Sequence, residues 1–149
     1  YADSADYPAI ADVTADFVYA RLENAVEEEP AGYSDAALDH WDGVLATRRY
    51  LCGERLTEAD LCLFATLVRF DAVYFTHFKC NQRRILDYPH LNGYVRDIFQ
   101  TPGIAATCDF DHIKRHYFEC HRHLNPSGIV PLGPELTLDE PHGREALSR

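Results

Sequence analysis

Apolar residues recur at the three- and four-residue spacing of an amphipathic helix along most of the chain, and turn-forming residues separate five such segments. The first covers about residues 8–26, with Pro8 in its first turn. The second follows Ser34, a good N-cap residue, and runs to Cys52, where Gly53 is placed to end it. We find no segment with the strict alternation of a half-buried strand. The pattern therefore predicts an all-α fold, a bundle of helices.

The third segment, residues 57–75, carries the clearest local signal in the sequence. Thr57 offers a hydroxyl at the N-cap and Asp60 a carboxylate three residues later, so each side chain can bond a free backbone N–H group of the other in a variant of the capping box. Beyond this cap, only Arg69 and Asp71 are charged. A helix that is apolar on nearly all sides is typical of a buried helix. We therefore expect this segment at the centre of the bundle.

Two further helices and an irregular tail complete the expected fold. A helical stripe of apolar residues follows Pro89 and is broken at Pro102. The fifth helix begins after an N-cap at Asp109 or Asp111. Residues 125–149 contain four prolines and three glycines, which predicts an extended and irregular C-terminal tail. Because this tail also carries apolar residues, we expect it to wrap over the domain.

Composition narrows the class of protein. With 149 residues, of which 46% are apolar, the chain is one domain with a sizeable core. A net charge of −10 argues against a nucleic-acid partner, and no run approaches the ~20 apolar residues of a membrane span. The chain has 24 acidic residues but only two lysines. This balance suits concentrated salt, so we predict a salt-adapted source. Five scattered cysteines fit no disulfide framework and favour a reducing, cytoplasmic location.

Residues 112–121 combine imidazoles, a thiol and a phenol in one short helical segment. His112, His116 and Cys120 recur at four-residue steps, and such side chains are zinc ligands. The paired spacing of a usual zinc site is missing, however, and three collinear residues need a bend to converge on one ion. The other candidate is Tyr117, whose hydroxyl needs a hydrogen-bond partner or a ligand if it is buried. This tyrosine either lines a cleft or lies at the edge of the core with a backbone partner.

Several stretches of the chain resemble a known family. Residues 53–60 are similar to the capping motif that opens the core helix in the all-helical C-terminal domain of glutathione transferases. More specific matches resemble one branch of that superfamily, the glutathionyl-hydroquinone reductases or Xi class, and they cover residues 67–80, 111–121, 125–129 and 139–144. The resemblance predicts a glutathione transferase C-terminal-like helical bundle, strongly from about residue 50 onward and more loosely before it.

This resemblance implies a division of labour within a larger enzyme. A thioredoxin-like N-terminal domain, expected to lie outside residues 1–149, binds glutathione or a related low-molecular-weight thiol and supplies a catalytic cysteine. Residues 1–7 would be the remnant of the linker between the two domains. That cysteine attacks the sulfur of a glutathionyl-hydroquinone, a small aromatic thioether, and a second glutathione resolves the mixed disulfide. The helical domain forms one wall of the hydroquinone pocket, and Tyr117 inherits the role of a pocket tyrosine. None of the chain's own cysteines matches the catalytic one, so we expect residues 1–149 alone to be inactive, and we expect the whole enzyme to be a homodimer.

The sequence departs from the family at the second pocket tyrosine. Val26-Glu27 occupies the corresponding position, so either the pocket is remodelled there or Tyr19, Glu27 or Tyr33 takes the place of that tyrosine. This departure leaves two other interpretations open. The chain is alternatively a non-catalytic interaction or assembly module with the transferase fold, or a zinc-binding helical domain.

Overall fold

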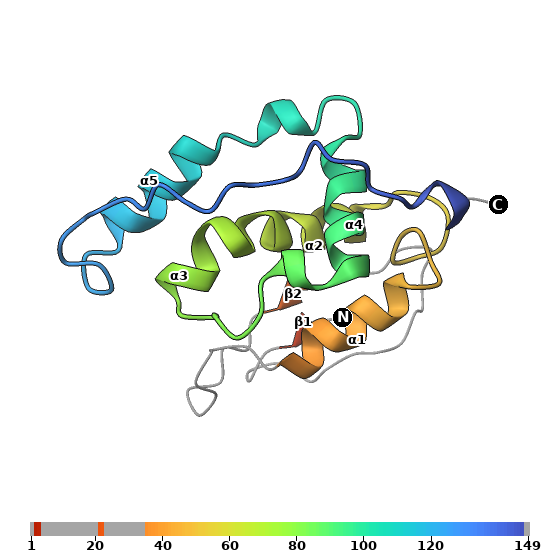
Figure 1. The fold of residues 1–149 in the computed structure, drawn as a ribbon, viewed down its shortest axis with the longest axis horizontal. Coiled ribbons are helices and arrows are strands. Elements are labelled where there is room, and N and C mark those ends of the chain that lie inside the picture. The colour runs from red at the N-terminus through yellow and green to blue at the C-terminus, as the bar shows by residue number, and fades with distance from the viewer. Residues whose placement is uncertain (1, 4–20, 23–34, 148–149) are drawn as a thin grey trace.

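The computed structural model describes residues 2–3, 21–22 and 35–147, and helices dominate this part of the chain (Figure 1). The regular elements are β1 (Ala2–Asp3), β2 (Arg21–Leu22), α1 (Asp35–Leu45), α2 (Glu58–Arg69), α3 (Phe75–His77), α4 (Pro89–Phe99) and α5 (Phe110–Cys120). A π-helical turn, Phe70–Tyr74, joins α2 to α3, and short 3-10 turns occupy Ile85–Asp87, Ala105–Thr107 and Glu145–Leu147. Apart from the two-residue strands, the predicted all-α fold is confirmed.

The N-terminus of α2 has the predicted cap, and the carboxylate of that cap also bonds two groups the sequence did not indicate. Asp60 Oδ2 accepts hydrogen bonds from the backbone N–H of Thr57 at 2.8 Å and from its hydroxyl at 2.7 Å. Asp60 Oδ1 accepts from the backbone N–H of Leu51 at 2.8 Å and from the hydroxyl of Tyr94 at 3.0 Å. The residue has no exposed surface. Because a buried carboxylate is costly without partners, these bonds stabilise Asp60 where α2, α4 and the preceding loop meet.

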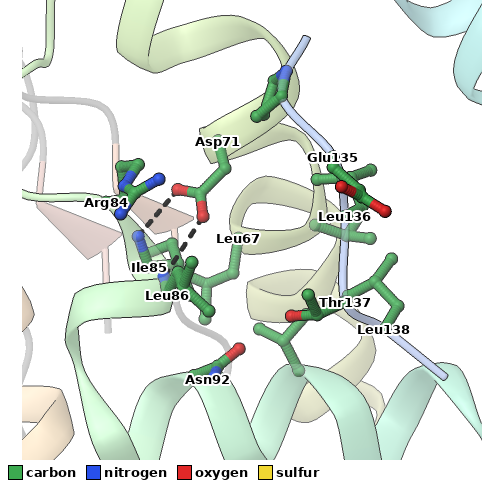
Figure 2. Close-up of a pocket in the computed structure, with 13 residues that line it drawn as sticks. Leu67, Asp71, Arg84, Ile85, Leu86, Asn92, Glu135, Leu136, Thr137 and Leu138 are labelled. Atoms are coloured by element: carbon green, nitrogen blue, oxygen red, sulfur yellow. Dashed lines mark hydrogen bonds between the residues drawn. The ribbon is translucent and has the colours of Figure 1, made fainter. Parts of the chain in front are cut away.

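The helix predicted for residues 57–75 is confirmed, with one change of helical type at Phe70–Tyr74. A π-helical turn holds an extra residue, so it rotates the side chains that follow relative to those of α2. Within this turn, Asp71 accepts hydrogen bonds from the backbone N–H groups of Ile85 at 2.7 Å and Leu86 at 3.1 Å, and burial raises the pKa of its carboxyl. Figure 2 shows this carboxylate beside a cavity of about 30 Å³ that the tail closes on the opposite side. Asp71 therefore holds the loop before α4.

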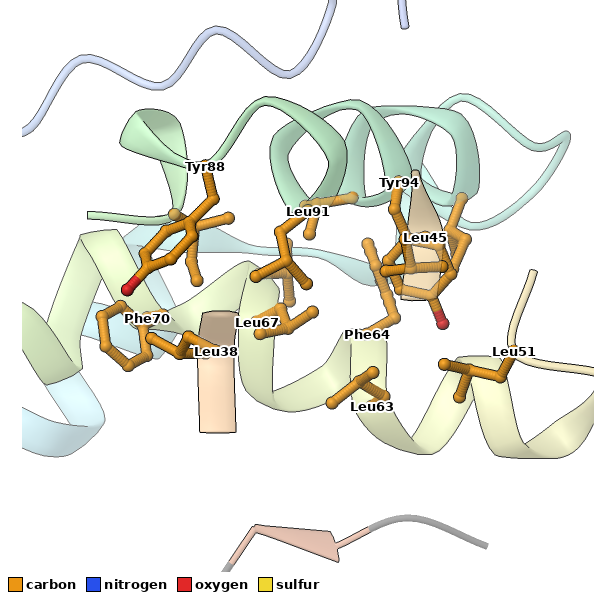
Figure 3. Close-up of a cluster of buried hydrophobic side chains, with 14 of the residues drawn as sticks. Leu38, Leu45, Leu51, Leu63, Phe64, Leu67, Phe70, Tyr88, Leu91 and Tyr94 are labelled. Carbon is orange, nitrogen blue, oxygen red and sulfur yellow. The ribbon is translucent and has the colours of Figure 1, made fainter. Parts of the chain in front are cut away.

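The main core lies where α4 meets α1 and α2 (Figure 3). Its fully or almost fully buried side chains include Leu38, Leu45, Leu63, Phe64, Leu67, Leu91 and Tyr94. Burying one such side chain contributes about 1.5–3 kcal/mol, so this cluster is the main source of stability. A second cluster of Ala72, Val73 and Phe118 forms where α5 packs against the π-helical turn. It brings the C-terminal half of α5 next to α3.

The second helix is shorter than the sequence predicted, because α1 ends at Leu45 and not at Cys52. The cause lies in the tail. The guanidinium of Arg144 donates hydrogen bonds to the carbonyl oxygens of Leu45 at 3.1 Å, Arg48 at 2.5 Å and Arg49 at 2.8 Å. If the helix continued, a backbone N–H group of the next turn would bond the carbonyl oxygen of Leu45. A side chain from the tail therefore replaces helical hydrogen bonds at this end.

The prediction of a first helix is wrong where the structure describes that segment. Arg21 and Leu22 form β2, which pairs in parallel with Ala2–Asp3 of β1. Backbone groups that bond a neighbouring strand are not available for helical bonds to the preceding turn, so no helix runs through these two residues. The rest of the segment 8–26 and the predicted cap Ser34 lie outside the described residues.

The tail is extended and crosses the helical layer, as predicted. The structure describes it as far as residue 147, and from Asn125 to Arg144 it has no helix or strand. In Figure 1 it runs back across α2 and α4. Leu138 packs against the main core and Leu136 against the second cluster. On α4, Arg96 donates a hydrogen bond to a tail carboxylate, Glu140, at 2.6 Å. Apolar and polar contacts together hold the tail on the domain.

Candidate functional site

Tyr117, the residue predicted to line a substrate pocket, lies near the C-terminal end of α5. Asp109, one of the two predicted caps, precedes this helix, and its carboxylate accepts a hydrogen bond from the backbone N–H of His112 at 2.9 Å. His121 follows the last helical residue as the C-cap, and its backbone N–H bonds the carbonyl oxygen of Tyr117 at 3.2 Å. The tyrosine side chain is half-buried and packs against the second cluster. The predicted fifth helix is therefore confirmed, and Tyr117 lies on its inward side.

The hydroxyl of Tyr117 meets the hydroxyl of Tyr74. The two oxygens are 3.4 Å apart, and the rings lie edge to face with centroids 5.8 Å apart. Tyr74 is the last residue of the π-helical turn, so the two phenols come from positions 43 residues apart. Tyr74 has no role among the sequence-based predictions. The signal that could have found it is its hydroxyl within the otherwise apolar helix 57–75.

The other candidates for a second pocket tyrosine are not placed by the structure. Tyr19, Glu27 and Tyr33 all lie outside the described residues. Within the described part of the chain, Tyr74 is the phenol whose hydroxyl lies next to that of Tyr117.

Aromatic and imidazole rings surround the two hydroxyls. We call this group the aromatic cluster, and it consists of Tyr74, His77, Phe78, Tyr117 and His121. Neighbouring ring centroids in the cluster lie 4.9 to 6.2 Å apart, and most of the pairs meet edge to face. Such a group offers apolar ring surfaces together with phenol O–H groups. This chemistry matches that of a flat aromatic ligand with an oxygen that accepts hydrogen bonds.

Two imidazoles of the cluster are hydrogen-bonded to each other. Nε2 of His77 lies 3.1 Å from Nδ1 of His121. His77 is 3% exposed, and burial, followed by the proximity of His121 and Lys79, lowers the pKa of its imidazole. In a hydrogen bond between two imidazoles, one ring donates its N–H to the lone pair of the other. At least one of the two rings is therefore neutral when the bond is made.

The thiols and the three candidate zinc ligands do not form a site of their own in the described part of the chain. All five cysteines are free. Cys80 follows the aromatic cluster in sequence, and burial raises the pKa of its thiol to about 11, so this thiol stays protonated near neutral pH. His112, His116 and Cys120 do not converge. In residues 2–3, 21–22 and 35–147, no three His, Cys, Asp or Glu side chains are arranged to hold a metal ion.

An apolar cleft of about 340 Å³ opens between α2 and the first half of α5. It is lined by Leu61, Phe64, Ala65, Val68, Arg69, Ile104, Thr107, Cys108 and Ile113. Its size falls within the roughly 300–1,000 Å³ of small-molecule pockets. Ile113 lies about one helical turn before Tyr117, so the cleft and the aromatic cluster share the inward side of α5.

Comparison with known proteins identifies the fold. Residues 16–97 match the model of the glutathione S-transferase C-terminal domain. The chain belongs to this family. It is 51% identical over 127 residues to the glutathionyl-hydroquinone reductase YqjG of Escherichia coli, covering 85% of this chain and 38% of that protein. It is also 47% identical over 120 residues to the glutathionyl-hydroquinone reductase PcpF of Sphingobium chlorophenolicum, covering 80% of this chain and 38% of that protein.

Solved structures show the same similarity. The glutathione-bound structure of YqjG has a TM-score of 0.72 with 55% identity over 74% of this chain and 36% of that one. A Xi-class glutathione transferase from Natrialba magadii has a TM-score of 0.75 with 53% identity over 76% of this chain and 36% of that one. The predicted resemblance to the Xi class is confirmed. The chain spans about 38% of the length of the curated relatives named above. Among the described residues, no helix is both long enough and apolar enough to cross a membrane.

Proposed function

We propose that this chain is the helical substrate-pocket domain of a glutathione-dependent reductase that acts on glutathionyl-hydroquinones. The observation that carries the proposal is the phenol pair of Tyr117 and Tyr74, whose hydroxyl oxygens lie 3.4 Å apart among aromatic rings. A hydroquinone is a flat ring that carries oxygens, so it matches both features of this site. The names of the similar reductases from Escherichia coli and Sphingobium chlorophenolicum give the same substrate class for related chains.

In this proposal the thiol chemistry belongs to another domain of the whole protein. A thioredoxin-like N-terminal domain binds glutathione or a related thiol and carries the catalytic cysteine. The buried and protonated Cys80 of this chain is unsuited to that role, since the thiolate is the nucleophile. Residues 1–149 alone are therefore expected to be inactive. The whole protein is expected to work in the cytoplasm as a homodimer.

The proposed reaction is a reductive removal of glutathione from the aromatic ring. The cysteine thiolate attacks the sulfur of the thioether, and the carbon–sulfur bond breaks. Its electron pair passes to the ring carbon, which takes up a proton, while glutathione remains as a mixed disulfide on the cysteine. A second glutathione thiolate then attacks this disulfide, which releases glutathione disulfide and restores the cysteine thiolate.

The phenols of this chain stabilise the charge that develops during the first step. Negative charge on the ring is shared with its oxygens as the carbon–sulfur bond breaks. The O–H of Tyr117 can donate a hydrogen bond to such an oxygen, and the O–H of Tyr74 can donate in turn to Tyr117. Donors placed before the reaction at a site of developing charge lower the barrier, and a chain of two hydrogen bonds polarises the first donor further.

The proposal is tested in the full-length protein with Tyr117→Phe. Phenylalanine keeps the ring and removes the hydroxyl, so the fold should persist while kcat for hydroquinone release falls about a hundredfold, as for other donors of this kind. Tyr74→Phe should reduce kcat less, because its hydroxyl acts through that of Tyr117. The matched control is Tyr50→Phe, which removes a hydroxyl from the main core outside the aromatic cluster. Thermal unfolding of each variant checks the fold.

Wild-type turnover in the Tyr117→Phe variant would contradict the proposed role of this domain. It would favour the alternative of a non-catalytic interaction or assembly module that has kept the transferase fold.

A further inference from the structure

Two neighbouring side-chain contacts join the π-helical turn and α3 to the C-terminal end of α5. In the first, the hydroxyl of Tyr74 lies 3.4 Å from the hydroxyl of Tyr117. In the second, the imidazole of His77 lies 3.1 Å from the imidazole of His121. Tyr74 and His77 are three residues apart, and Tyr117 and His121 are four apart, so each pair occupies one side of its own helical segment. The imidazole contact therefore ties together the same two turns that carry the phenols.

His121 is coupled to Tyr117 through both its backbone and its ring. Its backbone N–H bonds the carbonyl oxygen of Tyr117 at 3.2 Å, and the two ring centroids are 5.4 Å apart. On the other side of the contact, His77 is almost completely buried, and its ring centroid lies 6.2 Å from that of Tyr117. Because His77 is held by its surroundings, it gives His121 a fixed anchor. A shift of His121 away from this anchor would shift the last turn of α5, and Tyr117 with it.

We propose that the hydrogen bond between His77 and His121 is a positioning element for Tyr117, which holds its hydroxyl against that of Tyr74 and is released on acidification. His77 and His121 are positioning residues in this inference, since they act through Tyr117 and are not required to touch the substrate. The inference rests on the proposed function, because the position of Tyr117 matters for turnover only if this residue binds the substrate.

Acid releases the bond only when both rings are protonated. When only one of the two rings is protonated, its imidazolium N–H still donates a hydrogen bond to the lone pair of the other ring. A second proton removes that lone pair and places two cations in contact. The titratable or charged groups that face the two rings are Tyr74, Lys79, His116, Tyr117 and His123. None of these groups is a carboxylate, so none of them compensates the doubly charged pair.

The test compares two substitutions of His121 in the full-length protein. His121→Ala removes the bond and is expected to lower kcat roughly tenfold to a hundredfold with a smaller change in KM, as a misplaced substrate-positioning group does. His121→Asn places an amide oxygen near the former Nδ1, so it can accept a hydrogen bond from His77 and should retain most of the turnover. The matched control is His112→Ala, which removes an exposed imidazole from the first turn of the same helix.

The pH profile separates positioning from simple packing. In the wild-type protein kcat should fall on the acid side, at a pH below the ordinary histidine pKa of about 6.5, because both rings must be protonated to release the bond. In His121→Asn this acid limb should disappear, because neutral His77 and protonated His77 both donate to an amide oxygen. Thermal unfolding is measured for every variant. If His121→Ala does not fold, the pH profile of His121→Asn against wild type decides alone.

Three results would overturn the inference: wild-type kcat in His121→Ala, equal loss in His121→Ala and His121→Asn, or an unchanged acid limb in His121→Asn. The failure of this inference and that of the proposed function are distinguishable. Normal turnover in Tyr117→Phe contradicts the proposed function, whereas impaired Tyr117→Phe with normal His121→Ala contradicts only the positioning role.

Discussion

Arg144 in the tail donates a hydrogen bond at 3.1 Å to the backbone carbonyl of Leu45, the last residue of α1. The same guanidinium bonds the carbonyl of His90 in α4 at 3.2 Å, so one tail side chain joins two helices. The tail approaches closely at this point, since a Cβ atom at Gly93 of α4 would lie 2.8 Å from the carbonyl oxygen of His142. The tail therefore completes the helical layer that it crosses.

Arg144→Met should destabilise the fold strongly. The substitution keeps much of the apolar stem but leaves one buried and three partly buried carbonyl groups without this donor, which costs about 2–4 kcal/mol in the free energy of unfolding. Urea unfolding of the full-length protein, followed by circular dichroism, measures the change. The control is Arg115→Met on α5, whose arginine is exposed and makes only surface ion pairs. Similar midpoints for the two variants would contradict the structural role of Arg144.

Asp60→Ala should also be costly, because it removes the common acceptor of four hydrogen bonds. The backbone N–H groups of Leu51 and Thr57 would lose their partner, and we expect a loss of about 3 kcal/mol or more. Tyr94→Phe removes only one of the four bonds and should cost about 1 kcal/mol. Urea unfolding compares the two. Equal losses would show that the bond to Tyr94 dominates the site.

The helices that local signals define could be predicted from the sequence. The caps at Thr57 and Asp109 and the apolar periodicity that follows them act over a few residues, so α2 and α5 were placed correctly. The end of α1 could not be predicted, because Arg144 sets it from a position 99 residues away from Leu45. A tertiary contact of this range overrides the local signal of the glycine at position 53.

The candidate site was only partly predictable for the same reason. Tyr117 was found through a resemblance, but its partner Tyr74 comes from an element 43 residues away. The π-helical turn also rotates the face on which Tyr74 lies, and the apolar pattern of the segment gives no sign of that turn. The hydrogen bond between His77 and His121 joins residues 44 positions apart, so no local pattern in the sequence predicts it.

The acidic composition predicts that salt stabilises the protein. The chain has a net charge of −10, and its acidic side chains repel one another most strongly when salt screens them weakly. Raising KCl from about 0.1 M to about 1 M shortens the Debye length from about 10 Å to about 3 Å. The thermal midpoint of the full-length protein should therefore rise over this range. A midpoint that stays level or falls would contradict the salt-adapted interpretation.

The buried imidazole of His77 should make stability depend on pH in a defined direction. Its pKa in the folded protein is lowered by burial, while in the unfolded chain it is about 6.5. Between these values the unfolded state binds more protons, so the free energy of unfolding falls as the pH drops below about 6.5. Glutamine at this position does not titrate and keeps a polar group near the former Nε2. Wild type should therefore lose stability relative to His77→Gln as the solution is acidified.

Urea midpoints from about pH 8 to about pH 5 for wild type and His77→Gln measure this effect in the full-length protein. Taking the difference between the two proteins removes the contributions of other groups. One of these groups is Asp71, whose pKa is raised by burial and which therefore acts with the opposite sign, because a carboxyl of this kind stabilises the fold more as it is protonated. A difference that stays constant across the range would show that His77 is not the group that titrates. A difference that narrows in acid is the result we expect, and it would link the stability of the α3–α5 contact to the same imidazole that anchors Tyr117 through His121.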